Sequence, residues 1–141
     1  MLTQTEADEL IALPKTFVSL PSFYLPGGSD WSHELVGRQG QEKFLLDASR
    51  SSMRLSKLKL QSRGRSVVVL VRLDIDGAPH TNPDGTRVGG THIHIYKPDC
   101  EARWAVELDN NKFSCVKDIE KIYLDFCKFC AITPIKFQGA S

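Results

Sequence analysis

The sequence predicts an α+β fold, in which a mostly antiparallel, twisted sheet or half-barrel of about five to seven strands is accompanied by an N-terminal and a C-terminal helix. Three observations predict it. A helix-capping motif opens the chain, alternating apolar and polar residues fill its middle, and apolar residues recur every three or four positions near its end. The length of 141 residues suits a single domain, 1–141, with one hydrophobic core.

The first helix is expected to begin at Thr3, because Thr3 and Glu6 match the capping box Ser/Thr-x-x-Glu. The apolar stripe that follows stops before Pro14, which ends the helix. Residues 16–25 favour an edge strand or an extended segment, because prolines interrupt and follow them.

A hairpin is expected next, with strands at residues 34–36 and 43–48 joined by a connection that contains two glycines. From residue 52 to 63, apolar and basic residues alternate, but the apolar phase shifts by one position at Ser56-Lys57. A β-bulge at that point would return the basic side chains to one face of the strand.

The central, buried strand is predicted at residues 66–76, where valine, leucine and isoleucine dominate. Residues 77–90 form a turn-rich connection, which is long enough inside a compact domain to suggest a function. Further strands are expected at residues 91–96 and 103–108. Helical spacing of apolar residues then predicts a helix over 116–131.

Composition excludes several classes of protein. The chain is 41% hydrophobic and 25% charged, as ordinary globular proteins are. Its apolar runs fall far short of the roughly 20 residues that cross a membrane. The first residues have neither the basic nor the apolar segment of a secretory signal. We therefore expect a soluble, cytoplasmic protein without a membrane partner.

The four cysteines are expected to be reduced and buried in the core, as free cysteines usually are. Two of them form a Cys-x-x-Cys pair, but structural zinc sites of that type usually need a second close pair. The other two cysteines are too far apart in the sequence to supply it. The four are Cys100, Cys115, Cys127 and Cys130.

A basic interval runs from Arg50 to Arg72, with seven of the 18 Lys and Arg residues and no acidic residue. Uncompensated positive charge of this kind suits a phosphate backbone. The alternative is a solvated strand whose charges are neutralised by acids from elsewhere in the fold. The candidate residues for binding nucleic acid are Arg54, Lys57, Lys59, Arg63, Arg65 and Arg72.

A His-x-His pair lies in the expected strand 91–96, where alternation places His92, His94 and Tyr96 on one face. His80, in the long connection, is expected within reach of the same end of the sheet. Imidazole groups bind metals and transfer protons near neutral pH. The alternative is a structural pair of histidines bonded to neighbouring carboxylates. The candidate catalytic residues are His80, His92, His94 and Tyr96.

Three kinds of chemistry fit these residues. In metal-independent RNA cleavage, one histidine takes the 2′-hydroxyl proton, a second group protonates the leaving oxygen, and Arg or Lys steadies the phosphate. In plain binding of RNA or DNA, the rings stack on bases beside a basic track. In a metal site, His92 and His94 would need His80 or Asp74 as a third donor. The leading interpretation includes no metal and no cofactor.

Residues 54–57, 69–74, 77–85 and 90–96 resemble an uncharacterised family of small bacterial and phage-associated proteins. The resemblance covers most of the chain. It implies a prokaryotic, mobile-element setting, in which small proteins are often toxins, defence components or inhibitors of defence, and it assigns no residue a role. Our leading hypothesis is a nucleic-acid-acting protein, RNA-binding or an endoribonuclease. The alternative is a non-enzymatic protein-binding inhibitor or interaction module.

Overall fold

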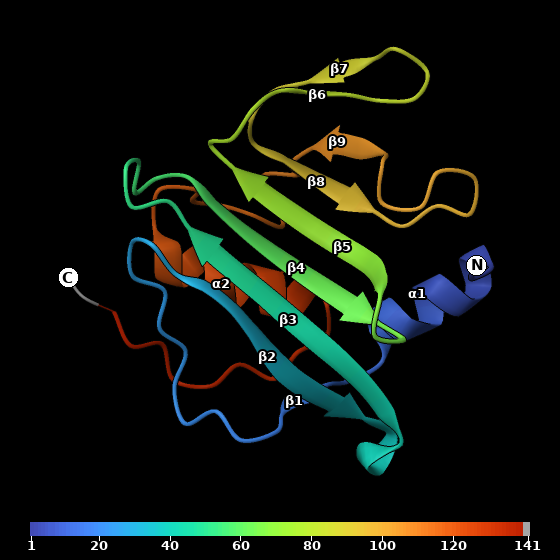
Figure 1. Ribbon diagram of the computed structural model, residues 1–141, viewed down its shortest axis with the longest axis vertical. Helices are drawn as coiled ribbons and strands as arrows, with labels where there is room; N and C mark the ends of the chain where they lie inside the picture. Colours follow the sequence, from blue (N-terminus) through green and yellow to red (C-terminus); the bar gives the residue numbers. More distant parts are fainter. Residues whose placement is uncertain (140–141) are drawn as a thin grey trace.

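An open seven-stranded sheet, in the order β1-β2-β3-β4-β5-β8-β9, dominates the computed structural model of the protein (Figure 1). The structure describes residues 1–139, so Ala140 and Ser141 of the predicted domain lie outside it. All neighbouring strands are antiparallel, and the sheet is twisted without closing into a barrel, which confirms the predicted α+β class. The strands are β1 (Thr16–Phe17), β2 (Asp30–Gly37), β3 (Glu42–Arg50), β4 (Leu58–Gly64), β5 (Val68–Ile75), β8 (His92–Ile95) and β9 (Ala105–Glu107).

Both predicted helices are present, as α1 (Gln4–Ala12) and α2 (Ile119–Phe129). The capping box of α1 is confirmed, because the Glu6 amide donates to Thr3 Oγ1 at 3.1 Å and the Thr3 amide donates to Glu6 Oε1 at 2.9 Å. Helix α2 begins later than predicted. Asp118 caps it by accepting a hydrogen bond from the Lys121 amide, so the residues before Asp118 stay outside the helix.

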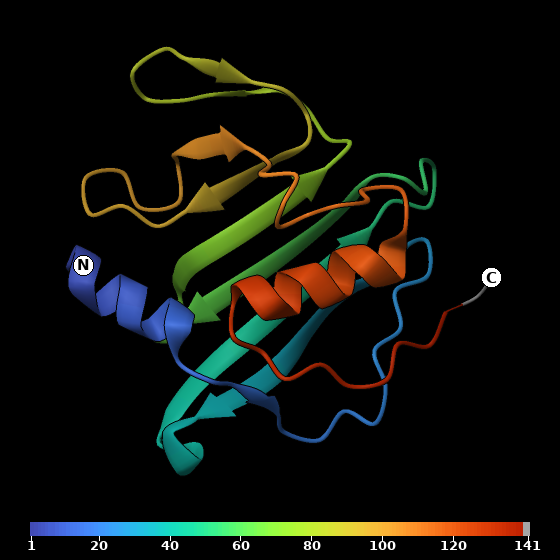
Figure 2. The same ribbon diagram turned by 180° about the vertical axis from the view of Figure 1, so that it is seen from behind.

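The hydrophobic core lies between α2 and one face of the sheet (Figure 2). Ile122, Tyr123 and Phe126 of the helix are buried there, which follows from their spacing of one and three positions along α2. The strands contribute residues of one alternation phase to the same core. These are Leu35 of β2, Leu46 of β3, Leu60 of β4 and Leu73 of β5.

The opposite face of the sheet, which we call the polar face, is left uncovered by α2 (Figures 1 and 2). Its side chains form two rows that cross neighbouring strands in register. Each row ends on a histidine of β8. One row is Asp30, Ser49, Lys59, Asp74 and His92, and the other is Ser32, Asp47, Gln61, Arg72 and His94.

The predicted hairpin around residues 37–41 is confirmed as β2 and β3, joined by the short helix η1 (Arg38–Gly40). The predicted bulge at Ser56-Lys57 is wrong. Residues 51–57 form a compact connection, because Ser51 Oγ accepts hydrogen bonds from the Met53 and Arg54 amides and holds the chain out of the sheet. The register shift of this strand lies instead between Ser62 and Arg63.

The long connection predicted at residues 77–90 contains a small hairpin of its own, β6 (His80–Thr81) and β7 (Arg87–Val88). Asn82 fastens this hairpin to β9. Its side-chain amide donates to the Ala105 carbonyl at 2.9 Å and accepts from the Ala105 amide at 2.7 Å. The buried Asn82 side chain thus makes the two hydrogen bonds that a neighbouring strand would make with Ala105 at the edge of the sheet.

Lys15 is a fully buried cation between the ends of the two helices. Its ammonium donates to the carbonyls of Ile11 and Leu13 at 2.9 Å and of Cys130 at 2.7 Å, and it lies over the ring of Phe44. Burial disfavours the charged form and lowers the pKa of Lys15 to about 8. The three carbonyls thus keep a buried lysine in place.

All four cysteines are free thiols, as predicted. Three of them are buried, and the exception is Cys115, which is exposed because it precedes α2 in a surface segment. Neither helix of residues 1–139 is long and apolar enough to cross a membrane.

Candidate functional site

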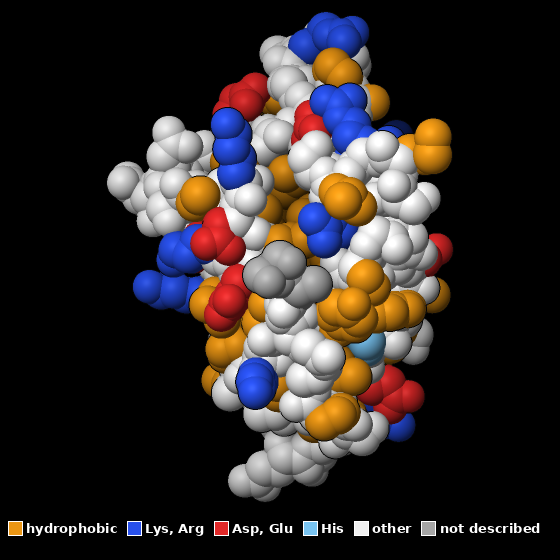
Figure 3. All heavy atoms as spheres, turned by 90° about the vertical axis from the view of Figure 1, so that its left-hand side faces the viewer, with side chains coloured by type: hydrophobic (Ala, Val, Ile, Leu, Met, Phe, Trp, Pro, Cys, Tyr) orange, Lys and Arg blue, Asp and Glu red, His pale blue; other side chains and the backbone are white. Residues whose placement is uncertain are grey.

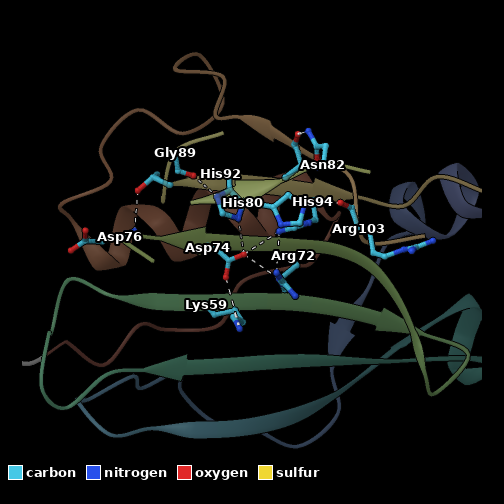
Figure 4. Close-up of polar contacts among 12 residues, drawn as sticks. Lys59, Arg72, Asp74, Asp76, His80, Asn82, Gly89, His92, His94 and Arg103 are labelled. Carbon is cyan, nitrogen blue, oxygen red and sulfur yellow. Dashed lines mark hydrogen bonds and ion pairs between the residues drawn. The ribbon is translucent and has the colours of Figure 1, made fainter. Parts of the chain in front are cut away.

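Asp74 lies at the centre of a group of polar contacts at the β8 end of the polar face (Figure 4). Its Oδ2 atom is 3.1 Å from His92 Nε2, 3.3 Å from His94 Nε2 and 3.1 Å from Arg72 Nε. Lys59 Nζ is 3.9 Å from Oδ1. Register explains the grouping, because β5 and β8 pair Asp74 with His92 and Arg72 with His94. One carboxylate therefore serves four potential donors.

Both ring nitrogens of His92 face hydrogen-bond acceptors. Nδ1 is 2.6 Å from the Gly89 carbonyl oxygen, and Nε2 faces Asp74. A carbonyl oxygen only accepts, so Nδ1 carries a hydrogen. A neutral imidazole then has a bare Nε2 pointed at a carboxylate oxygen. A second proton or a cation is needed to make that contact favourable.

His94 is also incompletely satisfied. Its Nε2 is 3.0 Å from Arg72 Nη2, a donor, while its Nδ1 is buried without a hydrogen-bond partner in the described part of the chain. Burial lowers the pKa of His94, even though Asp74 favours the charged ring. Burial alone would raise the pKa of Asp74, but the hydrogen bond with His94 and the charges of Arg72 and Lys59 lower it to about 2.

His80 joins the group from β6, as the sequence predicted. Its ring centroid is 4.7 Å from that of His94 and 5.8 Å from that of His92. His80 Nε2 is 2.7 Å from the Arg103 carbonyl oxygen, so in the neutral ring Nδ1 keeps a lone pair. We call Asp74, His80, His92 and His94 the histidine cluster. His80 is its most accessible ring, being half-buried rather than buried.

Tyr96 does not lie with the histidines, so the expectation that the three share a face is wrong. Strand β8 ends at Ile95, and alternation no longer applies beyond it. The Tyr96 side chain is buried in the core, where its hydroxyl accepts from the Leu2 amide and donates to the Leu2 carbonyl, each at 3.0 Å. Its hydroxyl is used to hold the N-terminal segment.

The basic residues are dispersed, because the bulge that would have gathered them is not formed. Lys59, Arg63 and Arg72 lie on the polar face, whereas Arg54 and Lys57 lie in the connection 51–57. Acidic side chains from other segments neutralise most of them, as the alternative interpretation proposed. The ion pairs are Arg54–Asp76, Arg63–Asp47, Arg65–Glu42, Arg72–Asp74 and Lys59–Asp74.

The sequence interpretation missed the role of Asn82 and gave Asp74 only as an alternative third donor. Asn82 looked like part of a turn, and its side chain instead positions the hairpin that carries His80. Asp74 was only one of two possible third donors, and it is the centre of the group. The sequence did contain one indication of Asp74: it lies two positions after Arg72 in the same predicted strand, so both side chains are expected on one face of the sheet. Which histidine it would meet depends on strand register.

This fold and cluster define a class of small α+β protein, with its polar centre on the uncovered face of an open antiparallel sheet. The chain belongs to a family of unknown function (DUF6978), whose model matches residues 2–132. The match confirms the resemblance to an uncharacterised family. Neither the curated proteins nor the solved structures gave a match.

Proposed function

We propose that the protein acts on RNA, binding a single strand along the polar face and cleaving it beside the histidine cluster. The observation that carries the proposal is that Arg72 and Lys59 pair with one buried carboxylate, Asp74, on the uncovered face, while the His80 ring lies against that of His94. The side chains of Lys59 and Arg72 are 49% and 30% exposed, so both are within reach of a ligand.

A hollow of about 280 Å³ adjoins the cluster and supports this placement. Its lining residues include the cations Arg50, Lys57 and Lys59, the acids Asp30 and Asp74, and Ser49. Lysine ammonium and serine hydroxyl groups are common partners of phosphate oxygens. With three cations against two carboxylates, the hollow can take a phosphate of a single strand.

The chemistry divides among the accessible residues. His80 takes the proton of a 2′-hydroxyl, and the 2′-oxygen forms a bond to phosphorus while the bond from phosphorus to the 5′-oxygen breaks. The Lys59 ammonium gives a proton to the departing 5′-oxygen, and Arg72 stabilises the charge on the phosphoryl oxygens. His92 and His94 are only 2% and 1% exposed, so they position His80 and Asp74 and do not touch RNA.

Cleavage of an end-labelled RNA oligonucleotide tests this proposal. We expect His80→Ala to lower the cleavage rate by about 10²–10⁴-fold, the usual contribution of a general base. Products should end in a 2′,3′-cyclic phosphate, and DNA of the same sequence should stay intact. Lys128→Ala, on the helix side of the sheet, is the matched control and should cleave normally. Full activity in His80→Ala would refute the assigned role.

RNA affinity gives an independent measurement. Binding through Lys59 and Arg72 should weaken as salt rises, and Lys59→Ala should make the logarithmic dependence on salt less steep by about one phosphate contact. In a toxin or phage-defence setting, which the resemblance implies, the substrate would be cytoplasmic RNA. Affinity that does not change with salt would contradict a phosphate-binding surface.

A protein-binding inhibitor is the second candidate, because a hollow with both apolar and charged lining residues lies beside the connection 51–57. It has a volume of about 560 Å³ and is lined by Leu55, Leu58, Ile75 and Val116 among others. Figure 3 looks onto this side of the molecule, where apolar side chains show between charged ones. Under this proposal the protein neither cleaves nor binds RNA, and a host protein that copurifies with it is lost in Leu55→Asp.

A further inference from the structure

We infer that Asp74, His92 and His94 bind one divalent transition-metal ion, for which Zn²⁺ is the appropriate probe. Three potential ligand atoms converge there, one from each residue, all within 4.8 Å of one another. Two imidazoles and a carboxylate are a donor set that suits zinc and neighbouring first-row ions. The inference goes beyond RNA cleavage and holds whether or not RNA is the substrate.

The distances match an ion of this size. Metal bonds of about 2.0–2.1 Å at tetrahedral angles place neighbouring ligand atoms about 3.3–3.4 Å apart. Asp74 Oδ2 lies 3.1 Å from His92 Nε2 and 3.3 Å from His94 Nε2. Two of the three separations therefore fit an ion directly. The third, between the two histidine nitrogens, is at most 4.8 Å, so the rings turn toward each other when an ion enters.

The hydrogen positions favour an ion as well. The Gly89 carbonyl fixes the hydrogen of His92 on Nδ1, which directs a lone pair from Nε2 toward Asp74. His94 Nε2 is 3.0 Å from Arg72 Nη2, so in the tautomer that accepts this hydrogen bond its lone pair is directed at Arg72. The His92 lone pair and an Asp74 carboxylate oxygen therefore face each other, and the His94 lone pair becomes available to an ion that displaces Arg72. A cation between them turns this repulsion into attraction.

The Gly89 carbonyl is held in its position by the backbone. The Gly77 amide donates to the Gly90 carbonyl at 2.9 Å and closes the connection that carries Gly89. A Cβ atom on Gly90 would lie 2.1 Å from the Gly77 carbonyl oxygen, so glycine is required for this close approach. Metal-bound histidines typically donate their other ring N–H to a carbonyl or carboxylate, which is what His92 does here.

Arg72 distinguishes a metal site from a network of hydrogen bonds. Its guanidinium occupies the lone pair of His94 Nε2 and adds positive charge beside Asp74, so it competes with an ion. Removing that charge should strengthen metal binding. The competing account has a doubly protonated His92 that donates to both Gly89 and Asp74. In that account no ion is needed, and Arg72 only stabilises the negative charge of Asp74.

Metal binding is measured on the full chain after treatment with a chelator and its removal. Titration with Zn²⁺ should show about one ion per chain with a dissociation constant below about 1 µM. Co²⁺ in place of Zn²⁺ should give the visible absorption bands of a low-symmetry, four- or five-coordinate site. Absence of stoichiometric binding by the folded protein would overturn the inference.

Variants test the ligand assignment. Asp74→Asn and His94→Gln should each weaken Zn²⁺ binding by at least about 100-fold, whereas Asp47→Asn, which alters another ion-paired carboxylate of the polar face, should bind as the wild type does. Arg72→Gln should bind at least about tenfold more tightly. If Asp74→Asn does not fold, Arg72→Gln and the Co²⁺ spectrum decide. Weaker binding by Arg72→Gln, or unchanged binding by folded Asp74→Asn, would contradict the assignment.

These titrations contain no RNA, and the cleavage assay depends on His80. Zinc binding without RNA cleavage would keep the metal site and refute the proposed function. RNA cleavage without zinc binding would do the reverse.

Discussion

Lys15 and Asp74 are both buried charged groups, and their surroundings differ in one respect. The ammonium of Lys15 meets three carbonyl oxygens, one for each of its hydrogens. Asp74 meets two histidines, an arginine and a lysine, and around it one ring nitrogen has no partner among residues 1–139 while another faces an acceptor. Every hydrogen of the Lys15 ammonium thus has an acceptor, whereas the hydrogen bonds around Asp74 are incomplete.

This difference indicates what each site is for. A buried group with all its hydrogen bonds made contributes to the fold, and changing it alters stability. Groups that are buried with mismatched donors and acceptors carry a cost that a ligand can relieve. The contrast between the helix-end site at Lys15 and the histidine cluster therefore supports a structural role for Lys15 and the proposal that the cluster binds a ligand.

The largest expected effect is the pH dependence of the stability that Lys15 contributes. Lys15 has a folded-state pKa of about 8, below the ordinary 10.5 of the unfolded chain, so between these values the unfolded chain binds more protons. Stability therefore rises with pH across this window, by up to about 3 kcal/mol relative to Lys15→Met. Urea unfolding of both proteins at pH 7 and pH 10 measures the change. A difference that stays constant with pH would mean that Lys15 titrates normally.

The next prediction compares the two sites directly. Zn²⁺ at about 100 times its dissociation constant should stabilise the wild type and Lys15→Met by about 2.7 kcal/mol each. Asp74→Asn, which should bind at least about 100-fold more weakly, should gain no more than about 0.4 kcal/mol. Thermal unfolding with and without Zn²⁺ shows the shift, and equal stabilisation of all three proteins would remove the distinction drawn between the sites.

The most local expected effect concerns the hairpin that carries His80. Asn82→Ala leaves the amide and carbonyl of Ala105 without their partner, which should cost about 1–3 kcal/mol. Amide exchange should accelerate in residues 80–88 and stay slow in β5. Asn82→Asp buries a carboxylate oxygen against the Ala105 carbonyl oxygen, so at pH 7 it should cost at least as much as Asn82→Ala. Uniformly faster exchange across the sheet would show that Asn82 supports the whole fold.

Local sequence signals predicted the fold class and most of its elements. The capping box at Thr3, the hairpin around residues 37–41 and the apolar spacing of α2 each depend on neighbouring residues, which a sequence shows directly. The start of β4 was predicted wrongly, because hydrogen bonds to one serine, Ser51, outweighed an alternating pattern. Alternation alone does not distinguish a strand from a loop with polar contacts.

The site was predictable in its residue types but not in its contacts. Alternation put His92 and His94 on one face, and the structure agrees. The pairing of His92 with Asp74 depends on the register of β5 and β8, which is set by long-range packing. Tyr96 shows the same limit, since its place was decided by contact with Leu2, 94 positions earlier.

The two hydrogen bonds between Asn82 and Ala105 also affect how readily this edge of the sheet can pair with another chain. An exposed edge strand offers free amides and carbonyls to another chain, and this is a common route to aggregation. Strand β9 is the last strand of the sheet, and a single side chain uses both the donor and the acceptor of its first residue. The edge nearest the histidine cluster is thus blocked against the addition of a further strand at Ala105.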